Sequence, residues 1–228
     1  NFPVIRLKYK TLSLNRITGK LEWKPINGIY IHKPHSELKK TQLTNGKSVI
    51  TTDDHSLFTL DPDCNFVEVS PTASPSTILS VKSIPYEGIE TIDPDLAFLI
   101  GTCIGDGCIA DNNDIKDSSM RLAISDPDVR ERISNIVMKY RGKPCNWHKY
   151  DERNVYQTSF SLLDMPRILT DINRGASNKQ IPPSLLSATA DVLWGLIDGL
   201  LSTDGHAVRR RYYYDTTSKQ LHDQVSFI

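Results

Sequence analysis

The chain repeats one pattern: an apolar run with small residues four positions apart, closed by Asp-Gly. The first copy is Leu99–Gly107 and the second is Ile197–Gly205. Such a run predicts a helix, and small residues on one helix face let a second helix backbone approach closely. Because both copies end in the same way, they indicate an internal duplication whose two helices pack against each other. Either copy alone would be interpreted as an ordinary buried helix that ends in a turn.

Asp106 and Asp204 close the two copies, and the glycine after each predicts a left-handed cap that ends the helix. A carboxylate at a helix C-terminus opposes the helix dipole, and two carboxylates brought together by helix packing repel each other. A divalent cation removes both penalties. The sequence therefore predicts a metal site at these two residues. Asp198 belongs to an alternative register, but only the register that closes at Asp204 finishes in Asp-Gly.

Together the two copies resemble the signature helices of the LAGLIDADG (DOD-type) homing endonucleases. The resemblance implies that the helices pair at a pseudo-two-fold axis, and that Asp106 and Asp204 bind Mg²⁺ and cut both strands of double-stranded DNA. The segment Asn178–Pro182 is similar to the Lys-x-Ile-Pro block of intein endonucleases, which implies a catalytic role for Lys179. A lysine near the metals could stabilise the phosphoryl transition state or orient water. Without the resemblance, Lys179 would be interpreted as an exposed linker residue.

Overall charge gives no support for nucleic-acid binding, because 27 Lys and Arg balance 27 Asp and Glu. The local pattern does give support, because His206–Tyr214 and Trp147–Tyr156 are each both basic and aromatic. In an extended strand alternate residues share one face, which could grip phosphates and contact sugars or bases. An exposed edge strand explains either segment equally well. The candidate DNA-binding residues are Lys149, Arg153, Arg209, Arg211 and Tyr213, the last three on one predicted strand face.

Residues 1–88 are predicted to be mainly β, because short runs rich in β-branched and aromatic residues alternate with turn signals such as Thr18–Lys20. Within them, Gly46–His55 resembles the Thr-x-x-His block of Hint-fold protein-splicing domains (inteins and hedgehog-like autoprocessing domains). The resemblance implies that His55 gives a proton to the departing amide nitrogen and that Thr52 holds the scissile peptide. Imidazole suits this role because it exchanges protons near neutral pH. On its own, Thr-x-x-His also fits a turn histidine that its neighbours satisfy.

From Ile92 onward the pattern changes to helices alternating with strands. We expect a helix from Asp93 through the first copy, a strand over Met120–Ser125, a helix from Asp126 to about Tyr140, two strands within Trp147–Phe160 and a short helix over Leu162–Ile172. This order is typical of an α+β unit with an antiparallel sheet. The predicted fold is a partial, mainly-β Hint-like domain (1–88) followed by an α+β LAGLIDADG endonuclease with a pseudo-two-fold repeat. Its first unit is 89–189, and its second, incomplete unit starts at 190 and runs to 228.

Both ends depart from the pattern of inteins, which begin with Cys or Ser and end in His-Asn. Residue 1 here is Asn, and the last residues are Ser226-Phe227-Ile228. The second endonuclease unit is also shorter than the first. We therefore expect the chain to be an interior part of a longer protein. On this hypothesis residues 1–228 do not splice by themselves, and they cut DNA poorly because the second half of the DNA site is incompletely gripped.

The preferred interpretation is an intein that carries a homing endonuclease. Such a protein makes Mg²⁺-dependent, site-specific double-strand breaks in DNA, within an element that splices itself out of its host-protein exteins. The alternative is a LAGLIDADG-derived DNA-binding protein, or a dead intein, without cleavage activity. A phosphate loop at Gly101–Gly107 is disfavoured, because its spacing matches neither GxGxxG nor a P-loop.

The cysteine pattern and the absence of a targeting signal bear on where the protein works. The four cysteines have no CxxC spacing, so neither zinc nor disulfides are indicated. No run is long and apolar enough for a membrane span, and no secretory signal opens the chain. We therefore expect a monomer in the cytoplasm, or in the host cytoplasm if the source is a virus, with no membrane partner.

Overall fold

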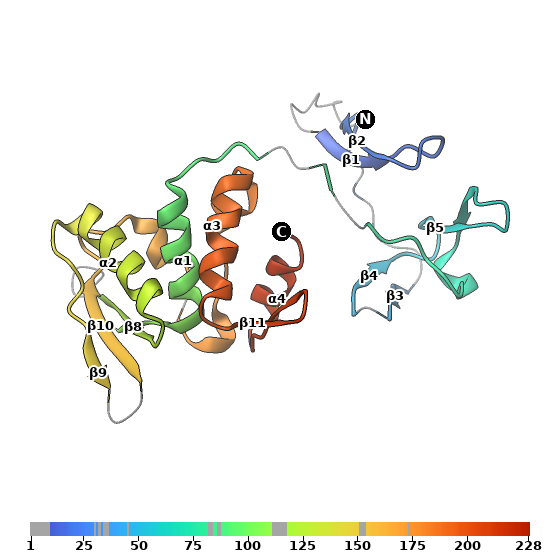
Figure 1. Cartoon of the computed structure of the whole chain (residues 1–228). Coiled ribbons are helices and arrows are strands. Elements are labelled where there is room, and N and C mark those ends of the chain that lie inside the picture. Colours follow the sequence, from blue (N-terminus) through green and yellow to red (C-terminus); the bar gives the residue numbers. More distant parts are fainter. Residues whose placement is uncertain are drawn as a thin grey trace. The chain divides into compact units, whose positions relative to one another are not determined.

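Figure 1 shows the computed structural model of the chain. The structure describes residues 10–29, 31, 33, 37–44, 46–81, 84–85, 88–110, 118–150, 154–172 and 174–228. The chain divides into two compact units, Asn1–Tyr86 and Glu87–Ile228. The segments 89–189 and 190–228, which the sequence pattern separates as two repeats, therefore belong to one compact unit.

The described part of the first unit consists of two-stranded antiparallel hairpins. They are β1 (Lys10–Leu14) with β2 (Leu21–Pro25), β3 (Lys39–Gln42) with β4 (Ser48–Thr51), and β5 (Leu57–Leu60) with β6 (Phe66–Val69), followed by the 3-10 turn η1 (Pro71–Ala73). Gly19 has a positive φ of 66° before β2, in the turn that the sequence predicts. Among the described residues of this unit, Leu57 is the one buried hydrophobic side chain. The hairpins therefore share little apolar core.

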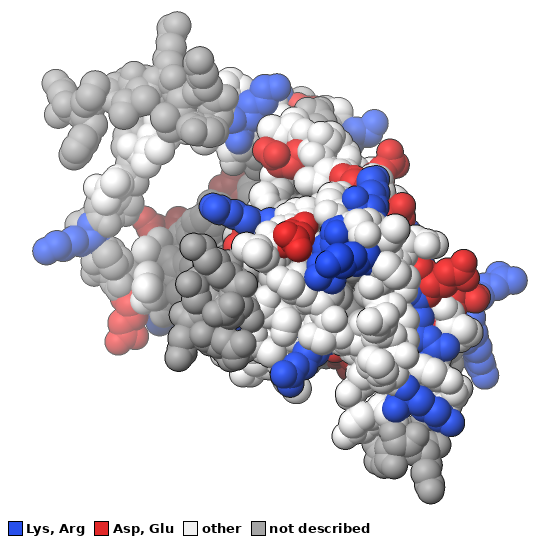
Figure 2. Space-filling view, turned by 90° about the vertical axis from the view of Figure 1, so that its left-hand side faces the viewer, with Lys and Arg blue, Asp and Glu red and all other residues white. Residues whose placement is uncertain are grey.

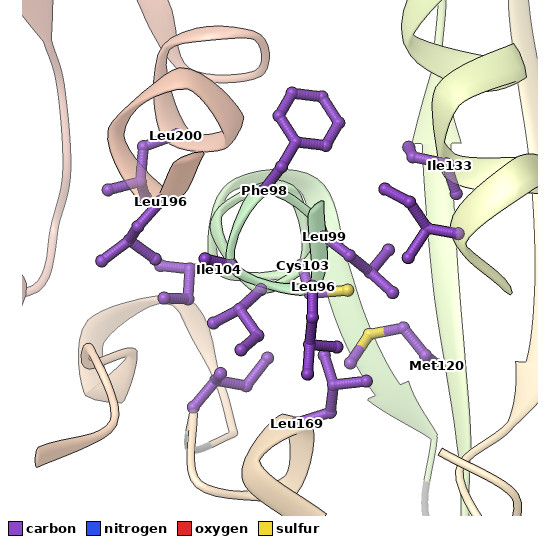
Figure 3. Close-up of a cluster of buried hydrophobic side chains, with 14 of the residues drawn as sticks. Leu96, Phe98, Leu99, Cys103, Ile104, Met120, Ile133, Leu169, Leu196 and Leu200 are labelled. Atoms are coloured by element: carbon purple, nitrogen blue, oxygen red, sulfur yellow. The ribbon is translucent and has the colours of Figure 1, made fainter. Parts of the chain in front are cut away.

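The core of the second unit is built around α1 (Pro94–Asp106), whose residues are all buried from Leu96 to Gly105. The helix begins where the sequence predicts, because the Asp93 carboxylate accepts a 3.0 Å hydrogen bond from the backbone N–H of Asp95. Figure 3 shows α1 end-on, with α3 (Ala190–Leu201) on one side and α2 (Pro127–Arg141) and β8 (Ser119–Ile124) on the other. A helix that is apolar all round needs such a fully enclosed place.

The close approach of α1 and α3 that the small residues predict is confirmed. A Cβ atom added to Gly101 would lie 3.0 Å from the Cα of Gly199. One added to Gly199 would lie 2.9 Å from the backbone nitrogen of Thr102. These obstacles are backbone atoms, which cannot rotate away as a side chain can. The two helix backbones are therefore in direct contact.

The two helices also run parallel. Gly195 of α3 faces the carbonyl of Pro94 near the start of α1, and Gly105 near the end of α1 faces Thr203. Figure 1 shows them side by side at the centre of this unit. Because the contacts advance together along both helices, Asp106 and Asp204 are brought to the same end of the pair.

Gly107 and Gly205 do not form the left-handed caps that the sequence predicts. Gly107 is extended (φ −82°, ψ 148°) and opens β7 (Gly107–Ala110), while Gly205 opens β11 (Gly205–Val208). At both places the strand starts against the last helical turn. A Cβ would lie 2.7 Å from the Cα of Cys103 at Gly107, and 2.8 Å from the carbonyl carbon of Leu201 at Gly205. Lack of space, and not a positive φ, therefore requires glycine here.

The second unit contains a four-stranded antiparallel sheet in the order β7-β8-β10-β9, with β9 at His148–Tyr150 and β10 at Val155–Ser161. α2 follows β8 after a cap from the Asp126 side chain and turns its apolar face to the core. β11 pairs with β12 (Arg211–Tyr214) as a separate hairpin, and the chain continues into α4 (Lys219–Val225).

The segment between β10 and α3 is built from 3-10 turns, namely η3 (Arg167–Thr170), η4 (Ala176–Asn178) and η5 (Pro183–Ser187). The short helix expected over Leu162–Ile172 is therefore reduced to η3. Pro166 explains this, since proline lacks the N–H that a helix needs and disfavours the helical conformation in the residue before it. Across the described ranges, no helix has the length and apolar character that a membrane crossing requires.

Candidate metal and nucleic-acid site

The two carboxylates that close the repeated pattern meet at the C-terminal end of the paired helices. Asp106 is the last residue of α1, and Asp204 immediately precedes β11. The pKa of Asp106 is raised above its ordinary value by partial burial and next by the charge of Asp204, while Lys179 lowers it. Partial burial also raises the pKa of Asp204, and Lys179 opposes that shift. The three residues therefore form one electrostatic cluster, which is still open to solvent.

Two carboxylates that are difficult to ionise side by side fit a cation site. Mg²⁺ is commonly held by one or two carboxylates together with waters and substrate phosphates, so the pair does not need a third protein ligand. Among the residues that the structure describes, no three or more His, Cys, Asp and Glu side chains are grouped as a metal cage. The donor set therefore suits an ion that shares its coordination sphere with solvent and substrate.

Lys179 is held beside the carboxylates by the end of α1. Its ammonium donates a hydrogen bond to the carbonyl oxygen of Gly105, one of the helix carbonyls that lack a partner within the helix. Burial lowers the pKa of Lys179, and the charges of Asp204 and Asp106 oppose that shift. A cation at a helix C-terminus is favoured by the helix dipole. Lys179 therefore offers a positive charge in a fixed position, and is not an exposed linker residue.

The backbone next to Lys179 is held in turn by α4. The hydroxyl of Ser218, which caps this helix, donates to the carbonyl of Lys179 at 2.7 Å. The side-chain amide of Gln224 accepts from the N–H of Ile181 at 2.8 Å and donates to its carbonyl at 3.1 Å. α4 therefore fixes residues 179–181 as a neighbouring strand would. Sequence reasoning missed Ser218 and Gln224, because no local pattern connects them with Lys179.

Tyr214 lies next to the same cluster and was also missed. It closes β12, directly opposite Gly205 in the strand register, and its ring packs on the core. Burial raises the pKa of the phenol, and the charges of Asp204 and Asp106 raise it further. Its hydroxyl oxygen is buried with no hydrogen-bond partner among the described residues. The signal in the sequence was the mixed aromatic and basic run, which gave no indication that one tyrosine turns inward.

Asp198, the alternative carboxylate, is engaged elsewhere. It accepts a 2.6 Å hydrogen bond from Arg132, which also contacts Asp95 at 3.1 Å and lies 3.7 Å from the ring centroid of Phe98. This arrangement ties α2 to both α1 and α3. Asp198 therefore has a structural partner in Arg132.

A hollow of about 660 Å³ lies beside Asp106, over one face of the four-stranded sheet. Strand register places Cys108, Arg121 and Ser159 across three strands on that face. The side chains that could contact a ligand there come from four strands, and include Arg121, His148, Gln157 and Ser159. Sequence reasoning missed these residues; the signal that could have found them is the alternation of apolar and other side chains over Met120–Ser125, which gives a strand one outward face.

Lys149 pairs with Tyr156, and the guanidinium of Arg130 from α2 lies 3.8 Å from the ring centroid of Tyr156. In the strand register, Lys149 is therefore on the sheet face that α2 covers. Lys149 also lines the rim of the hollow. Arg153, the other candidate in this hairpin, lies outside the described residues.

The β11–β12 hairpin follows Asp204 as β7–β8 follows Asp106. Arg211 and Tyr213 lie on β12, and the Tyr213 ring stacks on His206 with a centroid distance of 5.1 Å. Arg209 does not share their strand, contrary to prediction. It lies in the two-residue turn with a φ of 59°, because so tight a hairpin needs left-handed residues.

Charges of both signs occupy the surface beside α2 and the β9–β10 hairpin. Figure 2 shows Lys and Arg on this face among Asp and Glu, with no expanse of a single sign. The balance of charge in the whole sequence therefore also holds locally here. A polyanion at this surface would be bound by a few Lys and Arg side chains in specific positions, and not by a uniformly basic surface.

In the first unit, Thr52 and His55 lie in the turn between β4 and β5. The backbone N–H of His55 donates to the carbonyl of Thr52 at 3.3 Å. The neighbouring carbonyl of Asp53 accepts from the Ser70 hydroxyl at 2.9 Å, which ties the turn to the end of β6. The structure thus places both residues on one turn, a position that suits either a turn histidine or a proton donor.

The chain matches no protein-family model and no curated protein. Its function is therefore inferred from the residues and contacts described above. In chemical terms the second unit presents two carboxylates, a fixed lysine and a neighbouring polar hollow. This set can hold a divalent cation beside an anionic substrate.

Proposed function

We propose that the chain contains a Mg²⁺-dependent DNA endonuclease of the LAGLIDADG (DOD) type, carried within a protein-splicing element. The observation that carries the proposal is the meeting of Asp106 and Asp204 at one end of a parallel, glycine-packed helix pair, with Lys179 beside them. The duplication gives each half of the unit one carboxylate. Double-stranded DNA offers two backbone strands in a related two-fold arrangement, so each half can serve one strand.

The chemistry at this site follows from the charges that the chain places there. Asp106 and Asp204 would hold the metal. Burial raises the pKa of both carboxyls and the charge of Asp204 raises that of Asp106 further, which makes cation binding favourable. When bound, Mg²⁺ supplies activation of water and stabilisation of the departing oxygen of a phosphodiester. Lys179 adds a positive charge that needs no rearrangement to act on a phosphate, because Gly105 already holds its ammonium.

The DNA would lie over the strands that follow the two carboxylates. The hollow beside Asp106 offers Arg121 and His148, and the hairpin after Asp204 offers Arg211 and Tyr213. Cations of this kind bind phosphates, while histidine and tyrosine can contact sugars and bases. Because one chain carries both halves, a monomer suffices for cleavage.

For the first unit we propose the splicing role that the Thr-x-x-His resemblance implies. His55 would donate a proton to the departing amide nitrogen, and Thr52 would hold the scissile peptide of the adjoining extein. The shared turn, held by Ser70, supports this pairing of roles. The second candidate function is DNA binding without cleavage, for which the cations beside the hollow and on the β11–β12 hairpin suffice without a metal.

Cleavage of a plasmid that carries a selected target tests the proposal. The target is first selected from a random-sequence library with the complete protein that contains this chain. With Mg²⁺ the wild-type protein is expected to produce linear plasmid, whereas Asp106→Asn and Asp204→Asn produce none. Asp191→Asn, a change in an exposed carboxylate at the start of α3, is the matched control and cuts normally. Binding without cleavage by the wild type supports the second candidate, and full cleavage by Asp106→Asn contradicts the metal assignment.

A further inference from the structure

The strand register makes the two halves of the candidate site unequal at one position. Gly107, which follows Asp106, pairs with Leu122 on β8. Gly205, which follows Asp204, pairs with Tyr214 on β12. Leu122 and Tyr214 are therefore equivalent residues of the two repeats, each directly opposite the glycine that follows one of the two carboxylates.

The apolar parts of the Leu122 and Tyr214 side chains both pack against the apolar core of the second unit. Leu122 is 2% exposed and belongs to the apolar core, and the ring of Tyr214 packs against the same core. A leucine thus suffices for packing at this place in the first repeat. Packing does not explain why the second repeat has a phenol hydroxyl there.

The hydroxyl of Tyr214 is not explained by protein contacts either. It is buried and has no hydrogen-bond partner in the described part of the chain. A buried hydroxyl without a partner destabilises a folded protein, so its presence at a site calls for a reason. The two carboxylates whose charges act on this phenol are Asp204 and Asp106, one from each repeat. In the strand register Tyr214 is also directly opposite Gly205, the residue after Asp204, so the missing partner is to be sought beside Asp204.

We propose that Tyr214 is a positioning residue of the nuclease site, whose hydroxyl donates a hydrogen bond to a water held by Asp204 when the site is loaded. This inference rests on the proposed function. Mg²⁺ keeps several of its waters when it binds, and a fixed donor orients such a water. Because Leu122 offers no donor in the first repeat, the two strands of the DNA are cut under unequal conditions. The half that contains Asp204 depends on Tyr214, and the half that contains Asp106 does not.

The test is the ratio of nicked to linear plasmid for Tyr214→Phe, measured with the complete protein on its selected target. Phenylalanine keeps the ring and removes the hydroxyl alone. We expect about a tenfold slower second cut, the effect of one lost hydrogen bond, so that nicked plasmid accumulates while the first cut keeps its rate. Thermal stability should be unchanged or higher, because an unsatisfied buried group has been removed.

Tyr212→Phe is the matched control, since Tyr212 lies on the same strand and is 74% exposed. It should leave the ratio of nicked to linear plasmid unchanged. A wild-type ratio for Tyr214→Phe, with normal cleavage by the wild-type protein, overturns this inference and leaves the proposed function standing. A wild-type protein that neither binds the cation nor cuts DNA contradicts the proposed function and this inference together.

Discussion

The close contact between α1 and α3 predicts that a glycine-to-alanine substitution in it lowers the free energy of unfolding, although alanine favours helices. In Gly199→Ala, the added methyl would lie 2.9 Å from the nitrogen of Thr102 and 3.0 Å from the carbonyl carbon of Phe98. Both are backbone atoms of α1, so the helices must separate. Overpacking of this kind costs about 1–3 kcal/mol, and the better helix propensity of alanine returns at most about 1 kcal/mol. We expect a net loss of up to about 2 kcal/mol of unfolding free energy.

Chemical denaturation followed by far-UV circular dichroism measures this loss. Trp194→Ala, on the exposed face of α3 with 69% of the residue exposed, should change the unfolding free energy by no more than about 0.5 kcal/mol and serves as a control on the same helix. Since Asp106 and Asp204 are placed by this helix contact, Gly199→Ala should also weaken cation binding. A Gly199→Ala variant more stable than wild type would show that helix propensity outweighs the backbone contact between α1 and α3.

The other predictions concern single side chains. Asp106→Asn should stabilise the fold at neutral pH, because a carboxyl pKa raised by folding means that ionisation opposes folding. This gain should vanish below about pH 4, the ordinary Asp range, in thermal melts at several pH values. Gln224→Leu should lower the unfolding free energy by about 1–3 kcal/mol, since it leaves buried backbone groups of Ile181 unpaired. Equal losses in Gln220→Leu, on the exposed side of α4, would contradict this. His55→Ala should stop extein ligation in the complete protein, as judged by intact mass, and leave DNA cleavage unchanged; normal ligation would count against the splicing role.

The helix pair could be predicted from sequence because its determinants are local. Small residues four positions apart indicate which face of each helix packs and that the other copy is its partner, and the shared Asp-Gly ending indicates where each apolar run stops. The structure has this packing between α1 and α3. The role of Gly107 and Gly205 was mistaken for the same reason. A local pattern gives the end of a helix, but the space available to the next strand depends on where the chain turns.

Lys179 was expected beside the carboxylates from the Lys-x-Ile-Pro resemblance, but the contacts that hold this site could not be predicted, because they join distant segments. Lys179 reaches Gly105 across 74 positions, and Gln224 reaches Ile181 across 43. Neither residue lies in a periodic pattern that specifies its partner. The inward turn of Tyr214 likewise depends on its register with Gly205, which no single segment encodes.

Titration calorimetry with Mn²⁺ tests most directly whether Asp106 and Asp204 hold one cation site together, and it requires no knowledge of the DNA target. We expect that the wild-type chain binds the ion, that Asp191→Asn binds it equally, and that Asp106→Asn and Asp204→Asn each lose most of the affinity. Binding by both site variants as tight as that of the wild type would contradict this expectation.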